Sequence, residues 1–231
     1  MTEKPIPRIK RVRRGRPEDQ ERLRTQILEA ARQIYRREGL GGLTMRAVGA
    51  EVGVSAMALY RYFADKSELI HGLWDFVMVD VHESVHLAVD EAARAGAGPR
   101  GQLRACTDSA LTYWESHPDH FRLVFMTEQT AGPRRLPGIT DLPSYHRVID
   151  LAKGLIEALA DELGTGRAHC ALARDLRMAM IVGYLHARIV NQRYPWSDLP
   201  ALRAQMVDRI VEAVVACLRE SQPGASLRHA S

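Results

Sequence analysis

The chain has 231 residues, of which 46% are hydrophobic and 26% charged, and its formal net charge is +4. No apolar run approaches the ~20 residues needed to cross a bilayer. The basic N-terminus has no apolar segment behind it, which excludes a secretory signal. The three cysteines, Cys106, Cys170 and Cys217, lie far apart in apolar helical contexts, which favours reduced core thiols over a disulfide frame or a zinc cluster. We therefore expect a cytoplasmic protein with no membrane partner.

The positive charge is concentrated at the start of the chain. Residues 1–17 hold seven lysines or arginines and one glutamate, so the rest of the chain is slightly acidic. Prolines and the lack of apolar residues predict that this basic arm is disordered when free. Its Arg-Gly-Arg-Pro segment resembles the core of an AT-hook, whose arginines bind a narrow minor groove. Arg14 and Arg16 are therefore candidate DNA contacts, and diffuse attraction of phosphates by a solubilising tail is the alternative.

A first helix is predicted over residues 18–38, with apolar residues at helical spacing and glycines after it. Two short helices follow, over residues 45–52 and 56–63. Thr44 and Ser55 are their candidate N-caps, and Gly53 ends the first of them because glycine tolerates the left-handed conformation. Two short helices joined by a three-residue turn have the form of a helix-turn-helix, whose second helix enters a DNA major groove.

The second short helix carries unusual outward residues. Tyr60, Arg61 and Tyr62 are expected to point away from the core formed by residues such as Val48, Leu59 and Phe63. Hydroxyls and a guanidinium suit contacts to phosphates and base edges. The alternative is a three-helix core with a solvated face.

The run GLTMRAVGAEVGVSAMALYRYFADKSEL resembles the DNA-binding region of TetR/AcrR-type regulators, over about residues 22–70. The resemblance implies phosphate or backbone contacts by five residues: Thr44, Ser55, Tyr60, Tyr62 and Lys66. It implies that Ala56, Met57 and Arg61 face the bases, with Arg46 a further candidate. Met57 departs from the family, which often has glycine there, and its bulk limits how closely the helix can approach the duplex. The thioether of Met57 could instead contact a thymine methyl.

A long helix is predicted from Lys66 to about Arg94, because Asp65 and Glu68 form a capping-box pattern at its start. It would act as a lever that joins two parts of the chain. Further helices are predicted over residues 100–116, 118–129, 144–163, 167–191 and 199–220, with a long loop at 130–143. We thus predict an all-α fold of about nine helices. The expected organisation is a basic arm (1–17), a helix-turn-helix domain (18–65), a helical effector-binding and dimerisation domain (66–221) and a frayed tail (222–231).

The last two helices are apolar over a wider stripe than one core contact needs, which indicates a two-fold four-helix interface with a second subunit. A deeply buried helix pair within one subunit is the alternative. The residues predicted at the interface are Met178, Ile181, Leu185, Ile189, Met206, Ile210, Val214 and Leu218. Regulators that resemble this chain hold an effector in the helical body. Candidates by residue type are Trp74, Met78, Trp114, His117, Phe121, Phe125, Tyr145 and Tyr184.

One short motif favours different chemistry. Residues 82–86 match the H-E-x-x-H pattern of zinc proteases, but no third ligand is identifiable. A metal-responsive site formed by Asp75, His82 and His86 on one helical face stays a minor alternative. No catalytic grouping stands out, so we expect neither an enzyme nor a cofactor. We predict a sequence-specific, homodimeric transcriptional regulator that binds pseudo-palindromic double-stranded DNA, most simply a repressor released by a small-molecule effector. A non-specific architectural DNA-binding dimer is the alternative.

Overall fold

The computed structural model describes residues 17–126, 138–191 and 193–220. Within these ranges the chain forms nine α-helices and one 3-10 turn and contains no strand, which confirms the predicted all-α class. The basic arm with Arg14 and Arg16, most of the predicted loop and the predicted tail lie outside the described residues. The elements are α1 (Pro17–Gly42), α2 (Met45–Val52), α3 (Ala56–Leu59), α4 (Lys66–Arg94), α5 (Pro99–Ser116), α6 (Pro118–Phe125), η1 (Ile139–Asp141), α7 (Pro143–Leu163), α8 (Cys170–Val190) and α9 (Leu199–Arg219). No helix among them is long and apolar enough to cross a membrane.

The chain divides into two compact units, with the boundary between Leu73 and Trp74. The sequence-based boundary lay at residue 66, where α4 begins. The first two turns of α4 therefore belong to the first unit and the rest of the helix to the second, so one continuous helix contributes to both.

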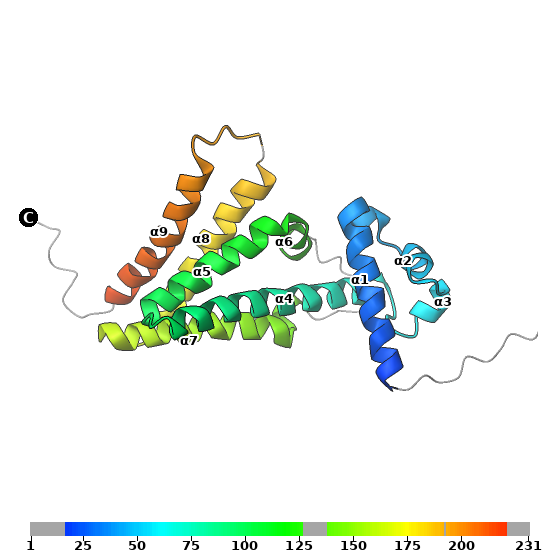
Figure 1. The fold of residues 1–231 in the computed structure, drawn as a ribbon, viewed down its shortest axis with the longest axis horizontal. Helices are drawn as coiled ribbons and strands as arrows, with labels where there is room; N and C mark the ends of the chain where they lie inside the picture. The colour runs from blue at the N-terminus through cyan, green and yellow to red at the C-terminus, as the bar shows by residue number, and fades with distance from the viewer. Residues whose placement is uncertain (1–16, 127–137, 192, 221–231) are drawn as a thin grey trace, which may run out of the picture. The chain divides into compact units, whose positions relative to one another are not determined.

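The first unit is a small helical domain around one apolar core. α1 packs on α2 and α2 packs on α3 (Figure 1). The core contains Ile27, Val48, Leu59, Phe63 and Leu69, each fully buried. Full burial of a large apolar side chain contributes about 1.5–3 kcal/mol, so these five contacts fix the position of the short α3 helix.

The second unit is a helical body in which α8 and α9 run side by side (Figure 1). α5 packs against α7, α8 and α9 and is the central helix of this body. The core of the unit is formed by apolar side chains from all of these helices, including Leu103, Leu111, Ile156 and Val214. The three cysteines are buried free thiols, as predicted. Burial raises the pKa of the Cys170 and Cys217 thiols.

The second helix of the helix-turn-helix is shorter than predicted. α3 ends at Leu59, and residues 60–62 form a turn instead of continuing the helix. The amide of Tyr62 donates to the carbonyl of Leu59 at 2.8 Å, three residues back, which tightens the last turn in the 3-10 manner. Aromatic residues lose rotamer freedom in a helix, and Tyr60, Tyr62 and Phe63 crowd this stretch. The tightened turn directs Phe63 into the core and leaves Tyr60 and Arg61 exposed.

Candidate functional site

The two N-caps that the sequence predicts are formed. The hydroxyl of Thr44 accepts a hydrogen bond from the amide of Ala47 at 3.1 Å, and that of Ser55 accepts from Ala58 at 3.2 Å. Gly53 ends α2 in the left-handed conformation, with φ at 77°. These contacts satisfy amides that have no partner within a helix. The helix-turn-helix is therefore shaped by its own side chains and backbone.

Sequence reasoning missed the role of Gly49. A Cβ atom at this position would lie 2.8 Å from the carbonyl oxygen of Val54 and 3.2 Å from the amide of Ala56. The amide of Val54 also donates to the carbonyl of Gly49 at 2.8 Å. The absence of a side chain at Gly49 thus lets the turn fold back onto α2. A glycine inside a helix pattern, four residues before the turn at Gly53, was the available signal.

The residues expected to contact DNA form an exposed surface of the first unit. Met57 is 76% exposed and Tyr60 is 49% exposed. Arg46 and Arg61 are exposed as well, whereas Ala56 and Tyr62 are half-buried. The fold therefore brings these side chains to the surface around α3, where a partner could contact them.

The charges on this surface are positive and accessible. Neither Arg46 nor Arg61 forms an ion pair with any residue that the structure describes. Lys66 is half-buried and donates from Nζ to the backbone carbonyl of Leu40 at 2.6 Å. One of its three donors thus ties the start of α4 to the end of α1, a structural role that the sequence did not indicate.

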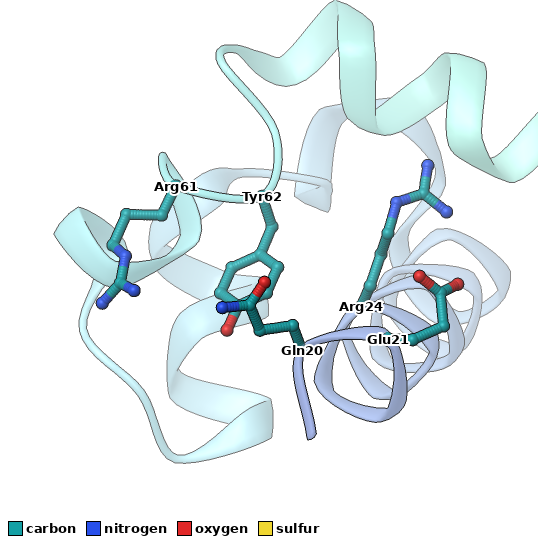
Figure 2. Close-up of a pocket in the computed structure, with 5 residues that line it drawn as sticks. All are labelled: Gln20, Glu21, Arg24, Arg61 and Tyr62. Atoms are coloured by element: carbon teal, nitrogen blue, oxygen red, sulfur yellow. The ribbon is translucent and has the colours of Figure 1, made fainter. Parts of the chain in front are cut away.

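A polar cleft lies beside this surface, between the start of α1 and the turn after α3 (Figure 2). Its volume is about 300 Å³, and its lining consists of Gln20, Glu21, Arg24, Arg61 and Tyr62. The guanidinium carbon of Arg24 lies 5.1 Å from the centroid of the Phe63 ring, which indicates a cation–π contact.

The predicted effector contacts belong to the second unit, and the structure brings several of them together. Trp114, Phe121 and Phe125 form one aromatic cluster, with ring centroids 4.9 to 6.1 Å apart. Trp114 and Phe121 are buried, whereas Phe125 is 40% exposed. Trp74 is buried nearby and donates from its indole nitrogen to the carbonyl of Leu123 at 3.0 Å.

The remaining predicted effector contacts have other surroundings. Met78 is buried, and Tyr145 is half-buried beside His146. His117 stacks on His120, with ring centroids 5.0 Å apart. Tyr184 donates from its hydroxyl to a carboxylate oxygen of Glu115 at 2.6 Å. Tyr145, His117 and Tyr184 thus have contacts outside the aromatic cluster.

Sequence reasoning also missed a polar network that connects α5, α8 and α9. Arg203 donates to Glu115 at 2.8 Å and to Asp108 at 2.9 Å, while Glu115 also accepts the bond from Tyr184. Burial, followed by the hydrogen bond to Glu115, raises the pKa of Tyr184 far above its ordinary value. Contacts between residues about 70 to 90 positions apart leave no pattern in the sequence.

The histidine motif does not form the metal site that was weighed as an alternative. No group of three or more potential metal ligands occurs among the residues with described positions. Asp75 accepts a hydrogen bond from Ser144 at 2.6 Å, and His86 lies 3.1 Å from Asp90. Burial, followed by the nearby His86 and Arg147, lowers the pKa of His82. Helical spacing placed the three residues on one face, but Asp75 has a tertiary partner on α7 and His86 pairs with Asp90 one turn along the same helix.

Most of the residues predicted at the dimer interface are covered within the single chain. Six of them are at most 5% exposed within the single chain and so belong to its own core: Ile181, Leu185, Ile189, Ile210, Val214 and Leu218. Met178 and Met206 are half-buried. Helical spacing identifies an apolar stripe, but it does not tell which neighbour covers that stripe. A second subunit would have to contact the outer faces of α8 and α9 instead.

Comparisons with known proteins agree with this architecture. The sequence profile described as "Bacterial regulatory proteins, tetR family" matches residues 27–73. The transcriptional repressor DrrR1 of Streptomyces coeruleorubidus is 37% identical over 125 residues, which is 54% of this chain and 43% of DrrR1. The nucleoid occlusion factor SlmA of Marinomonas sp. is 30% identical over 157 residues, 64% of this chain and 75% of SlmA. The chain thus spans less than half the length of DrrR1 and three quarters of SlmA.

The fold of the whole chain also has a counterpart of known structure. A putative transcriptional regulator from Pseudomonas aeruginosa PAO1 superposes with a TM-score of 0.68, covering 90% of this chain and 97% of that one, at 21% sequence identity. The match to the family profile and the similarity to SlmA, together with the helix-turn-helix and the helical body, identify the chain as a member of the TetR family of bacterial regulatory proteins.

Proposed function

We propose that this regulator is a homodimeric repressor that binds a pseudo-palindromic operator through α3 and the turn after it. The observation that carries the proposal is the exposure of Met57, Tyr60 and Arg61 around a helix that a buried core holds in place. Arg61 can donate two hydrogen bonds to a guanine edge, and Met57 can contact a thymine methyl. Tyr60, Tyr62, Thr44 and Ser55 have hydroxyls that can donate to phosphates and fix the register.

The outer faces of α8 and α9 are the surface that we propose for the second subunit. On α8, Leu172 is 58% exposed and Val190 is 39% exposed, and Gly183 between them is exposed too. On α9, Leu202 and Met206 are half-buried one turn apart. This spacing continues an apolar face along both helices. Because the TetR family binds DNA as dimers, a second copy of this chain is the occupant that fits the face.

The effector is proposed to bind in the second unit, near the cluster of Trp114, Phe121 and Phe125. The helix α4 begins in the first unit and continues into the second. A ligand that favours one arrangement of the second unit can therefore act on α4 and, through it, on the first unit. The ligand shifts the equilibrium only by its differential affinity for the two arrangements. The name of the similar DrrR1, a transcriptional repressor, supports repression as the sign of regulation.

Selection of binding sequences from a random duplex library tests the proposal. A sequence-specific regulator yields a two-fold symmetric site, and the selected site outcompetes random DNA at every salt concentration. An architectural protein that neutralises phosphates alone shows no such ratio. Recovery of no preferred sequence would contradict the proposed function.

A further inference from the structure

The polar cleft beside α3 adjoins the surface that we propose binds DNA. Figure 2 shows the ring of Tyr62 facing Gln20 across the cleft, with Arg61 on one side and Arg24 with Glu21 on the other. Tyr62 and Arg61 belong to the turn that directly continues α3, so the cleft extends the proposed DNA surface toward the start of α1. At about 300 Å³ it is large enough for a phosphate and part of a sugar.

Arg24 is held in place at the edge of this cleft. Its guanidinium lies over the ring of Phe63, which is fully buried and cannot move without disturbing the core. A guanidinium stacked on an aromatic face keeps its in-plane N–H groups free for an acceptor. Arg24 is therefore an oriented cation, and little conformational freedom would be lost when it binds an anion.

The two arginines of the cleft differ from those farther along α1. Within the described part of the chain, neither Arg24 nor Arg61 has an ion-pair partner. In the second half of α1, by contrast, Arg32 pairs with Glu29 at 2.9 Å, and Arg37 pairs with Glu51 at 3.2 Å. Arg32 and Arg37 are thus neutralised, whereas the two arginines at the cleft are not.

A second groove of the same unit serves as an internal comparison. It lies between α1 and α2, with a volume of about 560 Å³, and contains Glu29 and Glu51 but no lysine or arginine. The lining of this groove thus offers a polyanion no cation to bind. Of these two grooves, the cleft beside α3 is the one that combines uncompensated cations with neutral hydrogen-bonding side chains, the combination that suits a phosphodiester.

We propose that this cleft receives a segment of the DNA backbone and makes the start of α1 part of the DNA interface. Arg24 supplies charge at one side of the cleft, and the hydroxyl of Tyr62 donates to a phosphate oxygen. Arg61, at the other side, keeps its guanidinium for the base edge. Glu21 is the one acidic side chain in the lining and opposes the binding. The proposal rests on the proposed function, because it assigns an additional contact to the same DNA complex.

The test uses the full-length protein, a random-sequence duplex and the selected operator, with affinities measured by fluorescence anisotropy over a series of salt concentrations. Arg24→Gln is expected to weaken binding to both duplexes equally and to make the slope of log K against log salt shallower by about 0.9 per subunit. Arg24→Lys retains the positive charge and should keep the slope. Glu21→Gln should tighten binding to both duplexes by roughly threefold. Arg36→Gln is the matched control, because Arg36 is exposed on the same helix and does not line the cleft.

The outcomes separate the two proposals. If Arg24→Gln and Glu21→Gln both retain the wild-type affinity and slope while the wild type still prefers its operator, the cleft is not a DNA contact. A lower melting temperature of Arg24→Gln with an unchanged slope would also overturn it, because Arg24 would then only cover Phe63. If the wild type shows no preference for any sequence, the proposed repressor function fails, whatever the slopes of the variants.

Discussion

At the scale of single residues, the structure depends on short polar contacts that fix helix ends and helix pairs. Thr44 and Ser55 cap α2 and α3. Both roles can be predicted from the sequence, because an N-cap residue bonds an amide only three positions ahead. The hydrogen bonds of Lys66 and Tyr184 could not be predicted in this way. Their partners, Leu40 and Glu115, are 26 and 69 positions distant, so only the folded chain identifies them.

Replacing Ser55 by alanine should lower the free energy of unfolding by about 1 kcal/mol, because the amide of Ala58 loses its side-chain acceptor and keeps only the carbonyl of Ser55. Equilibrium urea denaturation measures the change. Ser55→Asp retains a capping oxygen and should keep most of the stability. Equal stability of Ser55→Ala and the wild type would show that the cap contributes nothing.

Ionisation of Tyr184 should lower the stability of the protein at alkaline pH. Burial and the bond to Glu115 raise its pKa in the folded state, whereas in the unfolded chain it ionises near pH 10. A raised folded pKa contributes stability that is complete below about pH 10 and is lost as pH rises. The free energy of unfolding should therefore fall less steeply between pH 9 and 11 for Tyr184→Phe than for the wild type. Parallel pH profiles would mean that Tyr184 titrates normally.

At the scale of elements, helix existence could be predicted from periodicity and capping, and the bounds of α2 and α4 agree with the sequence. The end of α3 could not be predicted in this way. Helix propensity does not show that a tight turn at residues 60–62 places Phe63 in the core. The same limit applies to the α8 stripe. Ile181 and Leu185 fit both a core and an interface by pattern, and only tertiary packing assigns them to the core.

Glycine-to-alanine substitutions at Gly49 and Gly154 should have opposite effects on stability, because Gly49 is close to the backbone of the turn and Gly154 is not. Gly49→Ala should destabilise the protein by about 1–3 kcal/mol, because its Cβ would collide with the backbone of Val54. Gly154→Ala, in an open position on α7, should stabilise it by about 0.5–1 kcal/mol through helix propensity. Thermal and urea denaturation of both variants provide the comparison. A neutral Gly49→Ala would mean that the turn tolerates a wider spacing.

At the scale of the whole molecule, family membership follows from the helix-turn-helix, while the second unit carries less information in its sequence. The motif is recognisable because caps and turn glycines are local and chemically demanding. An effector region consists of ordinary core residues such as Trp114 and Phe121, and any regular helical body contains similar ones. Residue type therefore suggested eight candidate contacts, of which only some lie together.

The proposed dimer surface can be tested at Gly183. Its position is exposed, and a Cβ atom added there would meet no atom within 4 Å beyond its chain neighbours and the backbone of its own helix, so Gly183→Gln should leave the protomer folded and favour the helix. In a close-packed interface between two copies of α8 the added side chain should cost about 1–3 kcal/mol. Sedimentation equilibrium should therefore show weaker dimerisation, with Gly154→Gln on α7 as the matched control. Unchanged dimerisation of Gly183→Gln would place the interface elsewhere.

The central claim is that α3 and the turn after it read DNA sequence in a two-fold complex. Its most direct test is competition between the selected operator and random DNA, with wild-type protein and Arg61→Ala. The wild type should prefer an operator whose half-sites lie about 34–36 Å apart, or a multiple of that distance. Arg61→Ala should lose about 1–3 kcal/mol of discrimination at one base pair in each half-site. An unchanged base preference in Arg61→Ala, or a wild type that binds random DNA equally well, would contradict the account.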